Sequence, residues 1–206
     1  MKAANMQQVK NAAGGTLNRR DAVGKILRGR TNALIVTGLG SPTYDVAAHG
    51  DHDRNFYLWG AMGGAAMIGL GLALAQPKVP VLVITGDGEM LMGLGSLATI
   101  GIQRPPNLAV IVFDNGVYGE TGMQPSHTQA RDFGGVDLLK VAAGCGIETC
   151  LDVQDEAGLA DLAGRLKALN GTLFARVLIE AVDPPRVLPE RDGVVLKRRF
   201  RAALGV

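Results

Sequence analysis

The sequence has few aromatic residues, few cysteines and little net charge, and each shortage excludes a class of protein. Phe, Trp and Tyr make up 4% of the 206 residues, and the formal net charge is +2. A chain so close to neutral offers no basic surface for nucleic acid or an anionic membrane. Cys145 and Cys150 have four residues between them, a spacing that fits neither a CxxC redox pair nor a zinc site. We expect both to be small buried side chains.

Apolar residues and glycine are abundant instead. Apolar residues make up 47% of the chain, and its 29 glycines are about twice the usual share. This composition predicts a single globular domain in which helices approach strands closely. The stretch from Leu58 to Ala75 has eighteen residues without a charge, the lower limit for a membrane span. Because five of the eighteen are glycine, we expect a buried helix rather than a membrane span. We therefore expect a cytoplasmic protein without a membrane partner, and the small net charge predicts no nucleic-acid partner.

Helical and strand-like segments alternate along the chain. We expect helices at 17–28, 60–75, 89–102, 136–144 and 155–169, strands at 33–37, 80–85, 108–113, 147–151 and 172–180, and polar loops at 41–57 and 116–134. The strands are nearly continuous apolar runs, which is typical of a parallel sheet covered on both faces. The sequence therefore predicts an α/β fold with one doubly wound sheet of five or six strands. The expected divisions are an N-terminal arm (1–16), the domain (17–182) and a C-terminal tail (183–206) with a short helix from about 193.

Two polar motifs follow neighbouring apolar runs. Gly86-Asp87-Gly88 ends the run 79–85, and Asp114-Asn115-Gly116 ends the run 108–113. Asp87 and Asn115 are 28 positions apart with one helix between them. They should therefore meet at the carboxyl edge of two parallel strands, where open α/β sheets bind ligands. Carboxylate and amide oxygens suit Mg²⁺, and the helix that Gly88 opens could direct N–H groups at a diphosphate.

These motifs resemble the diphosphate- and metal-binding motif of thiamine-diphosphate-dependent enzymes, which has GDG, a spacer of similar length and an Asn pair. Asp114 stands here in place of the first Asn. The resemblance implies that Asp87 and Asn115 are side-chain ligands of Mg²⁺ and that Val117 is a main-chain ligand. The alternative is an ordinary βαβ unit with turn-forming Gly and Asn, in which Asp87 only caps a helix.

The resemblance also covers loops that hold the cofactor in this family. It implies that Gly88 and Glu89 donate backbone N–H groups to the diphosphate. Gly38 and Leu39, at the end of the first predicted strand, match a second loop that touches the diphosphate.

The segment 58–63 is similar to the part of pyruvate-decarboxylase-like enzymes that keeps thiamine diphosphate bent. By that match Met62 supports the bend, and the Gly60 carbonyl accepts a hydrogen bond from the 4′-amino group. The alternative for Met62 is an ordinary core methionine.

In this family the carboxylate that activates the pyrimidine ring belongs to a second domain. Only about thirty residues precede the first predicted strand, so we expect a separate pyrimidine-domain (alpha) subunit that supplies the activating Glu in a hetero-oligomer. GDGEMLM, LATI, Thr121-Gly122 and Gln124 most resemble 2-oxo acid decarboxylases for sulfopyruvate or phosphonopyruvate. This implies a carboxy-lyase with a small anionic substrate. A carboligase, a subunit of a 2-oxo acid oxidoreductase and a non-catalytic cofactor-binding subunit stay open.

Candidate catalytic residues lie in the polar segment 116–134. Glu120 and His127 are the candidates for proton transfer, and Thr121 and Gln124 for orienting the substrate. The family's Glu lies one position away from Glu120, so a solvated surface residue is the alternative there. Arg131 is the candidate for binding the anionic tail of the substrate.

Overall fold

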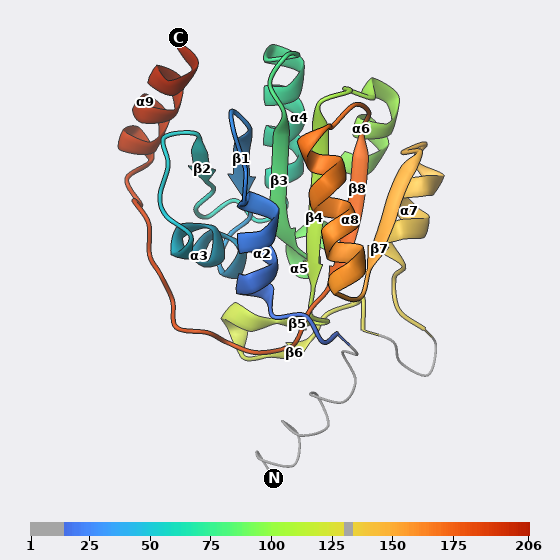
Figure 1. The fold of residues 1–206 in the computed structure, drawn as a ribbon. Helices are drawn as coiled ribbons and strands as arrows, with labels where there is room; N and C mark the ends of the chain where they lie inside the picture. Colours follow the sequence, from blue (N-terminus) through green and yellow to red (C-terminus); the bar gives the residue numbers. More distant parts are fainter. Residues whose placement is uncertain (1–14, 130–133) are drawn as a thin grey trace.

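A six-stranded parallel sheet forms the centre of the protein, in a computed structural model that describes residues 15–129 and 134–206 (Figure 1). The strands lie in the order β2-β1-β3-β4-β8-β7. They are β1 (Leu34–Thr37), β2 (Asn55–Tyr57), β3 (Val81–Gly86), β4 (Leu108–Asp114), β7 (Thr149–Val153) and β8 (Leu173–Leu178). The expected α/β fold with one doubly wound sheet is confirmed.

Helices cover both faces of this sheet. One face carries α2 (Arg19–Leu27), α3 (Ser41–Ala48) and α8 (Glu156–Lys167). The other carries α4 (Ala65–Ala75), α5 (Asp87–Met92), α6 (Ser96–Gln103) and α7 (Leu138–Gly144). The last helix, α9 (Gly193–Leu204), packs beside the edge strand β2, where the ring of Phe200 lies 5.5 Å from that of Phe56 in an edge-to-face contact. A covered edge strand is protected from pairing with another chain.

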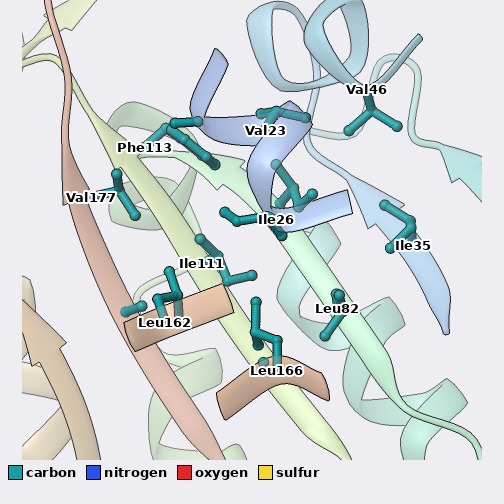
Figure 2. Close-up of a cluster of buried hydrophobic side chains, with 14 of the residues drawn as sticks. Val23, Ile26, Ile35, Val46, Leu82, Ile111, Phe113, Leu162, Leu166 and Val177 are labelled. Atoms are coloured by element: carbon teal, nitrogen blue, oxygen red, sulfur yellow. The ribbon is translucent and has the colours of Figure 1, made fainter. Parts of the chain in front are cut away.

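Figure 2 shows the core on the face that α2 and α8 cover. Ile26 of α2 and Leu162 of α8 converge there with Ile111 of β4. Val110 and Val112, the neighbours of Ile111 in the strand, belong to the core on the opposite face, because successive side chains in a strand alternate. Both faces are buried, which is why the strands read as continuous apolar runs.

The chain reverses its direction across the sheet between β1 and β3. α3 leads from β1 to β2 on one face, and α4 leads back to β3 on the other. The crevice outside the carboxyl ends of the strands at such a reversal is the usual ligand site of this architecture. In the pairing of β3 with β4, Gly86 lies opposite Phe113, so Asp87 and Asp114 follow side by side. The expectation that the two polar motifs meet at this edge is confirmed.

The segment 41–57, expected to be a loop, contains α3 and β2. Pro42 occupies the first turn of α3, where its fixed φ suits a helix. Residues 42–47 are buried, and the Thr43 hydroxyl donates to the Gly38 carbonyl at 2.8 Å. The prediction is wrong because these polar side chains find partners inside the fold, which composition does not reveal.

Glycines shorten two of the predicted helices. α4 begins at Ala65 rather than near 60, and the helix expected at 89–102 is divided into α5 and α6 around residues 93–95. A Cβ atom on Gly93 would clash with the carbonyl oxygen of Gly63. Only glycine permits this approach, which brings the turn before α4 against the end of α5.

The segment 116–134, also expected to be a loop, holds a small hairpin. β5 (Val117–Tyr118) pairs antiparallel with β6 (Gln124–Pro125), and a 3₁₀ turn (Gly119–Thr121) lies between them. The helix expected from about 193 is α9. Most of the proposed arm, 1–16, lies outside the described residues, and the division into arm, domain and tail stays a prediction. Within the described ranges, no helix is long and apolar enough to cross a membrane.

Candidate cofactor site

A cleft of about 80 Å³ opens at the carboxyl edge of the sheet, beside the ends of β1, β3 and β4. Eight of the fourteen predicted site residues line it: Leu39, Met62, Asp87, Gly88, Glu89, Asn115, Val117 and Glu120. Gly38, Gly60 and His127 are not part of its lining. Motifs that are far apart in the sequence therefore converge on one cavity.

Asp87 is a deeply buried carboxylate at this cleft. Its side chain is 2% exposed, and its Oδ2 accepts hydrogen bonds from the Ser126 hydroxyl and, at 3.1 Å, from the Thr128 hydroxyl. Burial and the neighbouring Asp114 carboxylate raise the pKa of Asp87 to about 6. Both hydroxyls engage Oδ2, and no other residue in the described ranges bonds to Oδ1, which is therefore the oxygen that could bind another ligand.

Asp114 lies beside Asp87 and shares a hydroxyl with it. Its Oδ1 accepts from the Gly116 N–H at 3.0 Å and lies 2.8 Å from the oxygen of the Thr128 hydroxyl, whose single proton can go to only one of the two carboxylates at a time. Burial raises the pKa of Asp114 as well. Two neighbouring carboxylates that are costly to ionise mark a place where a bound cation would be favourable.

Asn115 and Val117 offer two further oxygens at the same edge. The Asn115 side-chain oxygen accepts from the Val117 N–H at 3.0 Å, which fixes the orientation of the amide. Val117 pairs with Pro125, but the Ser126 N–H bonds to the Gly116 carbonyl, so Val117 and Pro125 do not bond to each other. The Val117 carbonyl therefore points away from β6. A carboxylate, an amide oxygen and a main-chain carbonyl form a donor set that fits Mg²⁺.

The side chain of Glu89, in α5, accepts hydrogen bonds from β3 and from the start of α4. Its Oε2 accepts from the Thr85 hydroxyl at 2.5 Å, and its Oε1 accepts from the N–H of Ala65, the first residue of α4, at 3.3 Å. Burial raises the pKa of Glu89. A Cβ atom on Gly38 would clash with Oε2, so the observed role of Gly38 is to leave room for this carboxylate.

Met62 is exposed although it is large and apolar. Its side chain is 44% exposed, and it lines the cleft together with Asp87. The alternative of an ordinary core methionine is therefore wrong. Gly60 precedes it in an exposed turn, and the role expected for the Gly60 carbonyl stays a prediction.

The candidate catalytic residues occupy different environments. Glu120 lines the cleft, and its Oε2 lies 3.3 Å from Nη2 of Arg186 in the C-terminal tail. His127 is exposed and does not line the cleft. Thr121 and Gln124 bond to each other at the surface, with 2.6 Å between Nε2 and Oγ1. Of these candidates, only Glu120 is brought to the cleft.

Two hydroxyl residues at the site are not anticipated by the motifs. Ser126 is fully buried and Thr128 is half-buried, and both contact Asp87. The chain turns at 127–128, so no strand-like alternation of side chains in the sequence indicates this pair.

Arg19 is a further cleft residue that the sequence does not single out. Its side chain is 3% exposed, its Nη1 donates to the Ser41 hydroxyl at 2.6 Å, and its Nε lies 3.0 Å from Asp45 Oδ2. Burial lowers the pKa of Arg19 despite this carboxylate. Among the described residues that line the cleft, it alone is a lysine or arginine. Arg131, the predicted anion-binding residue, lies outside the described residues.

Comparison with known protein families identifies the family of the chain. The family described as "Thiamine pyrophosphate enzyme, C-terminal TPP binding domain" matches residues 39–177. The chain belongs to this family. The match extends from Leu39, at the end of β1, to Val177 in β8, and it includes both polar motifs. The resemblance that the motifs indicate is confirmed, and a thiamine-pyrophosphate-binding domain explains why they converge.

Curated relatives of this thiamine pyrophosphate domain include two proteins of similar length. The sulfopyruvate decarboxylase subunit beta of Methanothermobacter thermautotrophicus is 40% identical over 190 residues, which are 89% of this chain and 94% of that protein. The subunit of the same name from Methanococcus maripaludis is 35% identical over 191 residues, 91% of this chain and 98% of that protein.

A longer relative matches only in part. The phosphonopyruvate decarboxylase of Streptomyces viridochromogenes is 38% identical over 179 residues, 83% of this chain but 42% of that protein. The chain therefore spans less than half of this relative. Among solved structures, a 2-oxoglutarate:ferredoxin oxidoreductase from Magnetococcus marinus superposes with a TM-score of 0.65 at 16% identity, over 88% of this chain and 74% of that one. This likeness concerns the fold.

Proposed function

We propose that the chain is the thiamine-diphosphate- and Mg²⁺-binding subunit of a 2-oxo acid decarboxylase whose substrate resembles sulfopyruvate or phosphonopyruvate. One observation carries the proposal: Asp87, Asn115 and Val117, which have carboxylate, amide and main-chain oxygens, line one cleft in a chain that matches a thiamine pyrophosphate domain. The names and lengths of the two beta-subunit relatives support the choice of reaction.

In this proposal three groups hold the cation. Asp87 supplies the carboxylate oxygen that its hydroxyl partners leave unused, Asn115 its amide oxygen and Val117 its main-chain carbonyl. Mg²⁺ keeps positions for phosphate oxygens and water, so the same cation would neutralise the diphosphate. The N–H groups of Gly88 and Glu89, in the first turn of α5, would bond to the diphosphate.

The remaining cleft residues would orient the cofactor and the substrate. When bound, thiamine diphosphate supplies the electron sink that decarboxylation of a 2-oxo acid requires. Leu39 and Met62 line the cleft with apolar surface that would support the cofactor rings. Glu120 is the proposed proton-transfer residue, and its contact with Arg186 would hold the carboxylate at the rim.

A second polypeptide would complete the site. A volume of about 80 Å³ is well below the roughly 300–1,000 Å³ of typical small-molecule sites. The half-exposed Met62 would then be covered by the partner. We propose that this partner is a pyrimidine-domain (alpha) subunit that supplies the activating Glu.

The test is a decarboxylation assay on the reconstituted pair of subunits. The chain is mixed with a pyrimidine-domain subunit, thiamine diphosphate and Mg²⁺, and CO₂ release is measured with sulfopyruvate, phosphonopyruvate and pyruvate. We expect release from sulfopyruvate or phosphonopyruvate, which carry a second anionic group, loss of activity in Asp87→Ala, and a reduced kcat in Glu120→Gln. Release from pyruvate alone, with a ligated product, would instead indicate a carboligase.

A further inference from the structure

Ser126 and Thr128 form a hydroxyl clamp on the two buried carboxylates, and no prediction from the motifs included them. We propose that these two side chains are positioning residues for the cation: they hold Oδ2 of Asp87, so that Oδ1 faces the cation, and Thr128 couples Asp87 to Asp114. The inference rests on the proposed Mg²⁺–thiamine diphosphate site and identifies what orients it.

The clamp is built by the segment that follows β6. The Ser126 N–H donates to the Gly116 carbonyl at 2.8 Å, which fastens this segment to the second polar motif. The Thr128 N–H lies 3.3 Å from the Ser126 hydroxyl oxygen. The chain turns at His127 and Thr128, and in this turn Ser126 and Thr128 both contact Asp87 while His127 between them is exposed.

The hydroxyl protons are too few for the contacts that the clamp makes. Four oxygen–oxygen contacts join Ser126 to Asp87, Ser126 to Thr128 at 2.9 Å, Thr128 to Asp87 at 3.1 Å and Thr128 to Asp114 at 2.8 Å. Two hydroxyl groups supply only two protons. With both carboxylates ionised, two contacts have no hydrogen between the oxygens, and this cluster is rich in negative charge.

A cation bound to Oδ1 of Asp87 would offset the negative charge of the two carboxylates. The clamp would then do two things: restrict the Asp87 carboxylate to one orientation, and keep the second carboxylate close enough to strengthen the field at the cation. Groups that orient metal ligands in this way change metal affinity by about 10- to 100-fold when they are removed. The hydroxyl of Thr128 is the critical one, because it contacts both carboxylates.

Thr128→Val tests the clamp, because valine keeps the shape of threonine and lacks its hydroxyl. Thr128→Ser is the conservative variant that retains the hydroxyl. Thr172→Val is the matched control: the Thr172 hydroxyl donates to the Pro105 carbonyl at 2.7 Å, just before β8 begins, at the opposite edge of the sheet from the cleft. The readout is Mn²⁺ affinity at saturating thiamine diphosphate, measured by electron paramagnetic resonance with the partner subunit present.

We expect Thr128→Val to weaken Mn²⁺ binding by about 10- to 100-fold, and Thr128→Ser and Thr172→Val to bind nearly as the wild type does. Unfolding midpoints establish that each variant is folded. If the wild type and Thr128→Val bind Mn²⁺ equally well, the clamp has no positioning role and the proposed cofactor site stands. If the wild type itself binds no Mn²⁺, the proposed function fails, and this inference fails with it.

Discussion

The metal-free chain should lose stability as the pH rises from acid toward neutral, because ionising Asp87 costs free energy in the fold. Burial and the nearby Asp114 carboxylate raise the pKa of Asp87 from 3.8 to about 6. The folded state therefore holds this proton more tightly than the unfolded state does. The stabilisation is fully present below the unfolded pKa and is lost as the pH rises through the folded one.

The size of the effect follows from the two pKa values. A difference of about two units corresponds to about 3 kcal/mol at about 1.4 kcal/mol per unit. Roughly 2 kcal/mol of this would be lost between about pH 4.5 and pH 7.5, since the rest is already lost at the lower pH.

Urea unfolding of the chain in the presence of a chelator measures this loss at both pH values. Asp87→Asn is the matched variant, because it keeps the shape of the side chain and cannot ionise. We expect the wild type to lose about 2 kcal/mol more than Asp87→Asn does over this interval. Equal losses in the two proteins would refute the claim that ionisation of Asp87 destabilises the metal-free fold.

Three substitutions test other parts of the structure through unfolding or binding. Gly38→Ala should displace the Glu89 carboxylate and destabilise the fold by about 1–3 kcal/mol, measured by urea unfolding, and a wild-type midpoint would contradict the packing described for Gly38. Arg19→Met leaves the Asp45 carboxylate buried with one fewer cation and should lower the free energy of unfolding by about 3 kcal/mol. An unchanged unfolding curve would mean that the Arg19–Asp45 ion pair does not stabilise the fold. Phe200→Ala, in α9, should cost about 3 kcal/mol and expose the amides of β2 to hydrogen exchange, whereas unchanged protection would show that α9 does not cover this edge.

Local sequence patterns were sufficient to predict the sheet and the placement of the two polar motifs. Strands buried on both faces read as apolar runs, and Asp87 and Asn115 directly follow two of them. Adjacent parallel strands must bring such residues together, whatever the details of the loops. Leu39 was predicted from the resemblance to the family's second loop, and it lines the cleft.

Features that depend on long-range contacts could not be predicted in this way. Ser126 lies 39 positions from Asp87, and only the β5–β6 hairpin brings the two together. α3 reads as a polar loop because Asp45, buried beside Arg19, looks like a surface residue in the sequence. The break between α5 and α6 depends on Gly93 meeting a loop thirty positions earlier.

Binding of thiamine diphosphate is the most direct test of the central claim. The purified chain is titrated with thiamine diphosphate and Mg²⁺ by calorimetry, with and without a pyrimidine-domain partner, alongside Asp87→Ala. We predict tight binding when the partner is present and none in Asp87→Ala. No binding by the wild type under either condition, or undiminished binding by Asp87→Ala, would contradict the assignment of this cleft as the cofactor site.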